Sequence, residues 1–140
     1  MTSERGERAL VLYHTAGCHL CELAEAIAQA GAGVVIWGTN EEKNRKAEAQ
    51  LKAHGGKVLV QKVDVSNEQQ VGHAMQEAVA KMGRLDSVFA NAGIGNAARS
   101  FIEMTTEQYR KVLSVNLDGV FFTLREAARH MRDRASRGDK

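Results

Sequence analysis

The chain has 140 residues, which is enough for one domain with a single hydrophobic core and too few for two. Hydrophobic residues make up 44% and charged residues 26% of the sequence, as in globular proteins rather than disordered or membrane-embedded ones. With 19 basic and 17 acidic side chains, the net charge of +2 is too small to indicate a nucleic acid or an anionic membrane as a partner. No apolar run approaches the roughly 18 residues of a membrane span, and the N-terminus lacks the pattern of a signal peptide. We therefore expect a cytoplasmic protein.

Short apolar runs alternate with amphipathic stretches along the chain. Apolar residues at Leu20, Leu23, Ala24 and Ile27 follow the period of an α-helix with one buried side. The uniformly apolar segment 34–37 instead indicates a strand that is buried on both faces. The same patterns predict strands at 9–13, 34–37, 58–63 and 85–90, and helices at 18–30, 40–53, 66–82 and 105–131.

Polar residues mark the predicted helix starts, and glycines mark their ends. Asn40 and Thr105 are predicted N-caps, and Ser66 with Gln69 has the spacing of a capping box. Gly31 is predicted to end the first helix. The alternation of strand and helix occurs four times, which predicts a single α/β domain over residues 1–140 with a parallel sheet between two helix layers.

Four segments carry the motifs of one protein family: QAGAGVVIWGTNEEK, VDVSNEQQV, FANAGIG and VLSVNLDGVFF. In this order and spacing they resemble the N-terminal half of a short-chain dehydrogenase/reductase, over residues of about 26–134. The resemblance implies a Rossmann-like three-layer α/β/α sandwich with four parallel strands in the order 3-2-1-4, and with the C-terminal part of the parent fold missing. It also implies an NAD(P)-dependent oxidoreductase as the parent.

The resemblance assigns roles to residues that follow the third and fourth strands and to one in the last helix. Asp64 and Val65 match the pair that borders the adenine ring, and Asn91, Ala92 and Gly93 match the loop beside the adenine ribose. Each has a structural alternative, because aspartate can start a turn and glycine lets the backbone bend.

Asn116 matches the asparagine of the family's catalytic tetrad, which holds a water in a proton relay. Its structural alternative is a hydrogen bond to a neighbouring loop.

Two departures from the family pattern bear on activity. The family's Tyr-x-x-x-Lys, which gives a proton to the substrate oxygen, has no counterpart, since neither Tyr13 nor Tyr109 has a lysine four residues later. The three glycine positions that let a pyrophosphate approach the first helix are occupied by His14, Cys18 and Leu20. We therefore expect no dehydrogenase activity, no required cofactor and at most weak binding of NAD or NADP, with no preference between the two readable from the sequence.

The first strand and helix, at about residues 9–25, resemble glutaredoxin-like proteins instead, through the segment LVLYHTAGCHLCELAEAI. Cys18 and Cys21 lie three residues apart at a helix start, where the unpaired N–H groups favour a thiolate, so both are redox candidates. The alternatives are inert thiols, a thiol ligand site, or a zinc set with His14 and His19, which no second ligand pair supports. Two parent families in one chain imply an engineered chimera, with natural fusion or divergence as alternatives.

The last predicted helix is apolar on more than one side, and the fourth strand lies at a sheet edge with unpaired backbone groups. Contiguous apolar surface of this kind marks interfaces. We therefore expect a homo-oligomer that assembles through the C-terminal helix or the fourth strand.

Overall fold

The computed structural model of the protein describes residues 9–13, 20–95 and 100–138, apart from the side chains of the first strand and of residues 20, 21 and 23. The elements in chain order are β1 (Ala9–Tyr13), α1 (Leu20–Gln29), β2 (Gly33–Gly38), α2 (Glu41–Lys52), β3 (Val58–Lys62), α3 (Glu68–Met82), β4 (Ser87–Val88), α4 (Thr106–Leu113), the π-helical turn η1 (Ser114–Asp118) and α5 (Gly119–Ser136).

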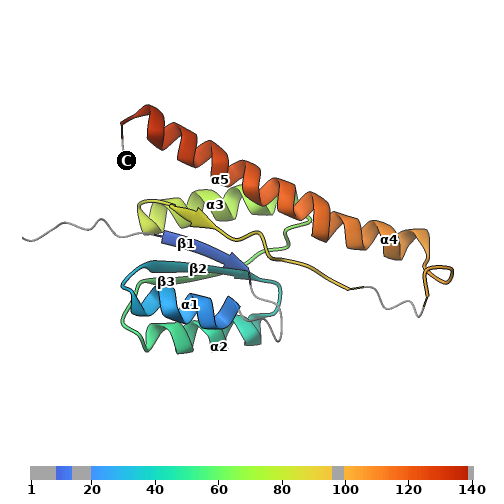
Figure 1. The fold of residues 1–140 in the computed structure, drawn as a ribbon, viewed down its shortest axis with the longest axis horizontal. Coiled ribbons are helices and arrows are strands. Elements are labelled where there is room, and N and C mark those ends of the chain that lie inside the picture. Colours follow the sequence, from blue (N-terminus) through green and yellow to red (C-terminus); the bar gives the residue numbers. More distant parts are fainter. Residues whose placement is uncertain (1–8, 14–19, 96–99, 139–140) are drawn as a thin grey trace, which may run out of the picture.

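The four strands form one parallel sheet in the order β3-β2-β1-β4. Val35 of β2 pairs with Val11 of β1 on one side and with Leu59 of β3 on the other. Helices α1 and α2 cover one face of the sheet, and α3 with α5 covers the other (Figure 1). Every residue of β2 is buried as a result, which agrees with its uniformly apolar sequence.

Strand β4 is shorter than the sequence predicts. The prediction of a strand over 85–90 was wrong at both ends, because only Ser87 and Val88 pair with β1. Leu85 is still buried in the core, so its apolar character reports packing rather than strand pairing. Beyond Val88, the N–H of Asn91 donates to the Phe89 carbonyl at 3.0 Å, and this tight turn ends the strand.

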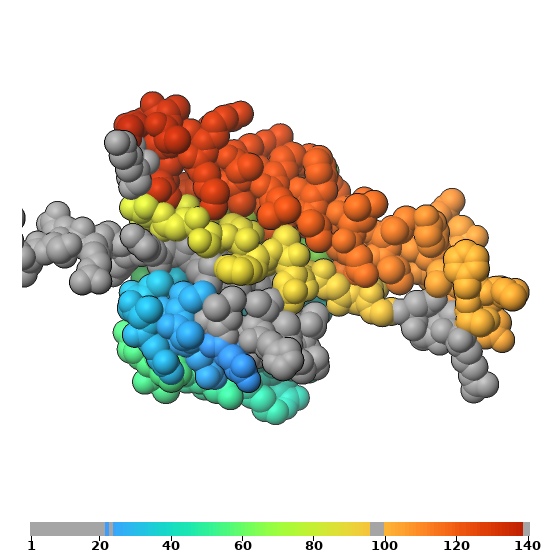
Figure 2. Space-filling view, viewed as in Figure 1, coloured from blue at the N-terminus to red at the C-terminus, as the bar shows by residue number. Residues whose placement is uncertain are grey.

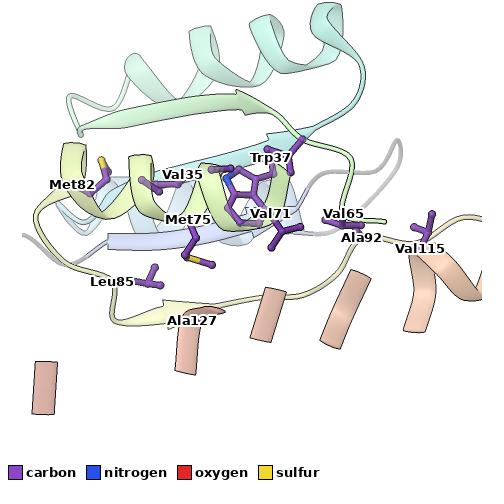
Figure 3. Packing of buried hydrophobic residues seen from close by; sticks show 13 residues of the cluster. Val35, Trp37, Val65, Val71, Met75, Met82, Leu85, Ala92, Val115 and Ala127 are labelled. Atoms are coloured by element: carbon purple, nitrogen blue, oxygen red, sulfur yellow. The ribbon is translucent and has the colours of Figure 1, made fainter. Parts of the chain in front are cut away.

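The larger hydrophobic core lies between the sheet and the layer of α3 and α5 (Figure 3). Trp37 is its largest fully buried side chain, and its indole Nε1 donates to Gln61 Oε1 at 2.7 Å. Gln61 in turn donates from Nε2 to Glu77 Oε2 at 2.9 Å. The buried indole N–H is therefore satisfied, as the burial of a polar group requires.

The helix starts follow the predicted caps in two cases out of three. Asn40 accepts from the N–H of Lys43, and Thr105 forms a full capping box with Gln108. The capping box predicted at Ser66 was wrong, since Asn67 is the N-cap of α3. The N–H and the hydroxyl of Ser66 instead both donate to Asp64. Gly31 ends α1 with a φ of 84°, as predicted.

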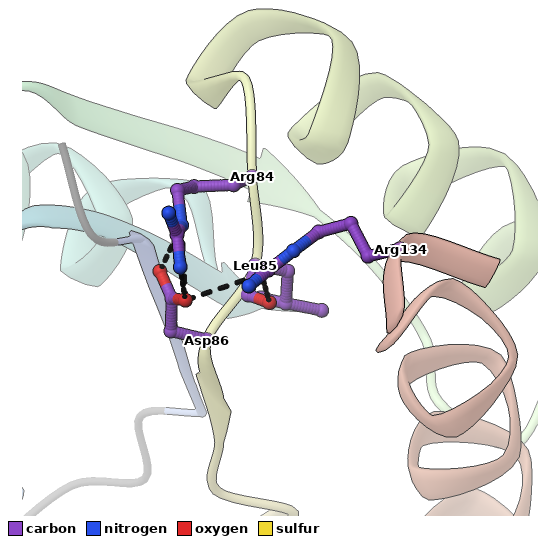
Figure 4. Close-up of polar contacts among 4 residues, drawn as sticks. All are labelled: Arg84, Leu85, Asp86 and Arg134. Carbon is purple, nitrogen blue, oxygen red and sulfur yellow. Dashed lines mark hydrogen bonds and ion pairs between the residues drawn. The ribbon is translucent and has the colours of Figure 1, made fainter. Parts of the chain in front are cut away.

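The last helix continues past the predicted end at residue 131 and reaches Ser136. Its final turns are anchored, because Arg134 donates from Nη1 to the Leu85 carbonyl at 2.7 Å and to Asp86 Oδ1 at 3.1 Å (Figure 4). Arg84 binds the same carboxylate. These contacts stabilise the polar residues after Met131 as part of the helix. Within the ranges that the structure covers, none of the helices has both the length and the apolar character for crossing a membrane.

Gly119, the first residue of α5, allows the helix to approach the end of the sheet closely. A Cβ at this position would lie 2.7 Å from Val65 Cγ2 and 3.3 Å from the Val65 carbonyl oxygen. The first distance is shorter than the contacts that Cβ atoms make in proteins, so a larger residue would push the helix away from the loop after β3.

We expect Gly119→Ala to lower the free energy of unfolding by about 1–3 kcal/mol, the usual cost of forcing a methyl group into a packed site. Urea denaturation measures the change. The matched control is Gly72→Ala in the middle of α3, where a Cβ would meet nothing within 4 Å. That variant should gain about 0.5–1 kcal/mol from helix propensity. Unchanged stability in Gly119→Ala would show that the contact with Val65 does not limit the size of the residue at this position.

Candidate functional site

The residues that follow β3 and β4 meet the middle of the long helix at one end of the sheet. Val65, Ala92 and Val115 are buried in the same cluster, and the close view shows Val65 and Ala92 side by side, with Val115 next to them (Figure 3). The carboxyl ends of parallel strands share one edge, and the crevice there is where α/β sheets bind ligands. One predicted residue from each loop, Val65 and Ala92, is therefore brought into the same cluster.

Asp64 lies in a local turn that keeps its carboxylate ionised. Its Oδ1 accepts from the Ser66 hydroxyl at 2.6 Å and from the Ser66 N–H at 2.9 Å, and its own N–H donates to Gln70 Oε1 at 3.0 Å. The Ser66 hydroxyl is the main cause that lowers the pKa of Asp64, and partial burial opposes it. The turn that the sequence offered as a structural alternative is thus present, and the carboxylate is an acceptor at neutral pH.

Asn116 joins the long helix to the loop after β4. Its Oδ1 accepts from the Ile94 N–H at 2.8 Å, and its Nδ2 donates to the Ile94 carbonyl at 3.0 Å. A Cβ on Gly93 would lie 3.5 Å from the same Oδ1, an ordinary contact. Asn116 therefore holds the backbone of one residue, Ile94, by both of its polar atoms, which is the loop contact expected as its structural role.

The side chain of Asn116 projects from the middle of the π-helical turn η1. Such a turn contains one extra residue within an otherwise continuous helix, and turns of this kind are frequent at functional sites. The sequence analysis predicted neither this π-helical turn nor the hydrogen bonds from Ser66 that hold the Asp64 carboxylate. The Asp-x-Ser spacing is the signal that could have found the second, because aspartate side chains often bond to the backbone two residues on.

The remaining predicted site residues divide into two groups. Asn91 is exposed on the loop after β4. Cys18, together with His14 of the former glycine positions, falls outside the residues that the structure describes, and so does the side chain of Cys21. Over the covered ranges, no three His, Cys, Asp or Glu side chains gather as a metal site would require.

Comparisons with known proteins agree with this geometry. A family model described as short chain dehydrogenase matches residues 20–139. L-xylulose reductase from Hypocrea jecorina is 36% identical over 113 residues, which cover 79% of this chain and 39% of the relative. Versicolorin reductase 1 from Aspergillus parasiticus is 36% identical over 112 residues, covering 79% and 42%.

Solved structures show the same relation. A short-chain type dehydrogenase/reductase from Mycobacterium marinum has a TM-score of 0.83 at 29% identity, over 92% of this chain and 51% of that one. An NAD+-bound xylitol dehydrogenase has a TM-score of 0.78 at 26% identity, over 93% of this chain and 50% of that one. The chain thus spans about half the length of these structures and somewhat less of the two reductases.

We expect Ser66→Ala to raise the pKa of Asp64 toward the ordinary value for aspartate, because the variant removes the hydroxyl donor that stabilises the carboxylate. A carboxyl group whose pKa is lowered by folding stabilises the folded protein at pH values above its ordinary pKa. This stabilisation is lost as the pH falls through the lowered pKa. Ser66→Ala should therefore lose acid stability at a higher pH than the wild type. Carboxyl NMR titration of Asp64 checks the shift, with the exposed Ser87→Ala in β4 as the control. Identical Asp64 titrations in all three proteins would contradict the assignment.

We expect Asn116→Ala to free the Ile94 amide, with a loss of about 1–2 kcal/mol in the free energy of unfolding for two hydrogen bonds near the surface. Hydrogen–deuterium exchange at Ile94 is the direct measurement, and it should be faster in the variant. Ser114→Ala is the control, because the Ser114 hydroxyl bonds within its own helix, to the Lys111 carbonyl. Unaltered exchange at Ile94 in Asn116→Ala would rule out the two-point contact.

Proposed function

The chain belongs to the short-chain dehydrogenase family, and we propose that it binds the adenosine part of a nicotinamide dinucleotide at the carboxyl edge of its sheet. The observation that carries the proposal is that one helix fixes both site loops. Gly119 packs on Val65 after β3, and Asn116 holds Ile94 after β4. Two loops held to the same helix form a preorganised rim, and preorganisation lowers the entropic cost of binding.

The residues at this rim suit an adenine ring and its ribose. The ionised Asp64 is an acceptor for an exocyclic amine, and the N–H of Val65 is a donor suited to a ring nitrogen. Ala92 and Gly93 carry little or no side chain, so a flat ring and a sugar can approach the backbone there. Asn91 adds an exposed amide for a ribose hydroxyl. The relative described as NAD+-bound supports a dinucleotide as the ligand class.

We propose that binding is weak and that the 140 residues carry out no hydride transfer by themselves. The nicotinamide ring supplies the hydride in this family of reactions, and a protein group must exchange a proton with the substrate oxygen. These residues include no Tyr-x-x-x-Lys, and Asn116 is the one member of the predicted tetrad among them. His14 and Cys18 add side chains at positions where glycines would admit a pyrophosphate.

Two parts of the proposal concern the rest of the chain. We propose that residues of about 9–25 derive from a glutaredoxin-like protein, with Cys18 and Cys21 as a dithiol; the thiol activity stays a prediction, because neither thiol is among the described side chains.

We also propose that the chain self-associates, through the long helix or through the open edge of β4.

We expect ADP-ribose and NADH to bind with similar dissociation constants, above about 100 µM, and nicotinamide mononucleotide to show no binding by calorimetry. A dissociation constant of this size corresponds to about 5.5 kcal/mol, which one adenosine half-site can supply. Asp64→Asn should weaken ADP-ribose binding about tenfold, because the amide oxygen carries no charge.

The control for this measurement is Asp133→Asn near the end of α5, which should bind ADP-ribose as the wild type does. Equal affinity for nicotinamide mononucleotide and ADP-ribose would contradict an adenosine site, and a low-micromolar constant would contradict weak binding. Steady NADH oxidation with carbonyl substrates, reduced by Asn116→Ala, would contradict the proposed lack of hydride transfer.

A further inference from the structure

Strand β3 forms one edge of the sheet, and the centre of this edge is apolar. In the part of the chain that the structure describes, no strand lies beyond β3. Its residues Val58, Leu59 and Val60 are only half-buried, whereas every residue of the neighbouring β2 is buried. Sheet edges are commonly protected by charges, prolines or bulges. The one charge within β3 is that of Lys62, and Glu41 pairs with it at 2.7 Å.

The hydrogen bonds with β2 determine which groups of β3 face outward. The Lys57 carbonyl accepts from the Val34 N–H at 2.8 Å. In a parallel ladder every second residue bonds to the same neighbouring strand, so Leu59 and Gln61 also face β2. The alternate residues direct their N–H and C=O groups away from the sheet, where another strand can pair with them: Val58, Val60 and Lys62.

An open groove of about 380 Å³ lies beside this edge, between β3 and α2. Val60 and Lys62 line it from the strand, and α2 contributes four polar side chains: Glu41, Asn44, Arg45 and Glu48. Lys62 and Lys52 pair with the two carboxylates. Arg45 forms no salt bridge with any residue that the structure describes. The space-filling view shows α2 at the border of the molecule opposite α5, so this face is separate from the long helix (Figure 2).

The charges on this side of α2 alternate in a self-complementary order. They are spaced four, three and four residues apart, which places them on one side of the helix: Glu41, Arg45, Glu48 and Lys52. Their midpoint falls between residues 46 and 47. If a second copy of α2 lies antiparallel about this midpoint, Arg45 faces Glu48 of the second copy and Glu41 faces its Lys52. A parallel arrangement would instead place like charges together.

One twofold axis suits both the helix and the strand. Antiparallel pairing about Val60 brings its outward groups against those of Val60 of the second copy. Helix α2 joins β2 to β3 and therefore runs opposite to them, and the Glu41 ion pair places its start beside Lys62. The midpoint of the charges lies between five and six residues, or about 8 Å, along α2 from Glu41. Val60 lies two residues, or about 7 Å, back from Lys62. The two centres are thus side by side.

The spacing of the layers allows the strand and helix contacts to form together. Helix α2 contacts both β2 and β3, and neighbouring strands lie about 4.8 Å apart. Two copies of α2 across the joined edge are therefore separated by about two strand spacings, or roughly 10 Å. Helices pack at about 8–10 Å, so arginine and glutamate side chains reach across the axis, and the groove gives them room.

We propose that β3 pairs with β3 of a second copy, antiparallel about Val60, so that the two four-stranded sheets become continuous and the two α2 helices meet through opposite charges. The surface is self-complementary, as closed dimers require. It lies apart from the long helix, β4 and the nucleotide site, so the inference does not depend on the proposed function.

Amide exchange at two protein concentrations tests the strand pairing. The Val60 N–H should exchange at least about fivefold more slowly at high than at low micromolar concentration, because the dimer gives it a hydrogen-bond acceptor. The Leu59 N–H is the internal control, since it already faces β2, and it should change much less. The same concentration dependence at both amides would overturn the pairing.

A proline tests the outward N–H directly. Val60→Pro removes this donor without removing a bond to β2, as edge strands tolerate. The variant should remain folded by circular dichroism, while the dissociation constant of the dimer from sedimentation velocity under reducing conditions rises at least about tenfold. Val60→Thr keeps both the N–H and the branched side chain, so it is the matched control and should dimerise as the wild type does.

A charge exchange on α2 tests the register. Arg45→Glu and Glu48→Arg should each weaken the dimer at least about threefold, since each places like charges across the axis, and the double variant should restore it. The control is Lys43→Glu, because Lys43 is exposed and lies outside the groove. Failure of the double variant to restore the dimer would overturn the register of α2.

The outcomes separate this contact from the proposed self-association. If folded Val60→Pro associates as tightly as the wild type, the β3 pairing is overturned, and self-association through the long helix or β4 still stands. A wild-type chain that is monomeric at high micromolar concentration would overturn both. ADP-ribose binding reports separately on the nucleotide site.

Discussion

The close approach of α5 to the loop after β3 is the constraint on which the site depends. Because Gly119 has no side chain, the helix rests on Val65, and the neighbouring helical turns reach the loop after β4. Val115 is then buried with Val65 and Ala92, and Asn116 meets Ile94. A single missing methyl group therefore sets the separation of two loops that are far apart in sequence. Interiors are packed too tightly to absorb an added atom without displacing one of these elements.

Polar contacts then fix the two ends of α5 against the rest of the domain. Near its start, Arg125 pairs with Glu68 at the first turn of α3, directly after the loop that holds Asp64 and Ser66. The Glu68 carboxylate is the main cause that raises the pKa of Arg125. Near its end, Arg134 binds the Leu85 carbonyl and Asp86. The helix is thus held at the site end by an ion pair and at the opposite end by a hydrogen bond to the backbone of the sheet layer.

Local patterns predicted the elements well and their long-range contacts poorly. The apolar β2 and the capping box at Thr105 were readable because their causes lie within a few residues. The length of β4 could not be predicted from local sequence, because it depends on pairing with β1 and on a turn at Asn91. The continuation of α5 to Ser136 depends on Arg134, whose partners lie some fifty residues earlier in the chain. Family motifs predicted Asp64 and Asn116 as site residues, but the partner of Asn116 is the backbone of Ile94, which no side-chain pattern marks.

The contact between Asn116 and Ile94 bears on whether this asparagine can have both a structural role and the water-holding role that the family pattern implies. A side-chain amide has four hydrogen-bonding positions, two lone pairs on the oxygen and two hydrogens on the nitrogen. The contact with Ile94 uses one of each. A structural role therefore leaves the amide with the capacity for another acceptor and another donor contact, and it fixes the directions in which these point. The structural role and the water-holding role that the family pattern implies are compatible, and the first prepares the geometry that the second needs. In a family member with the full set of catalytic residues, the loop contact would make the orientation of this amide independent of the substrate.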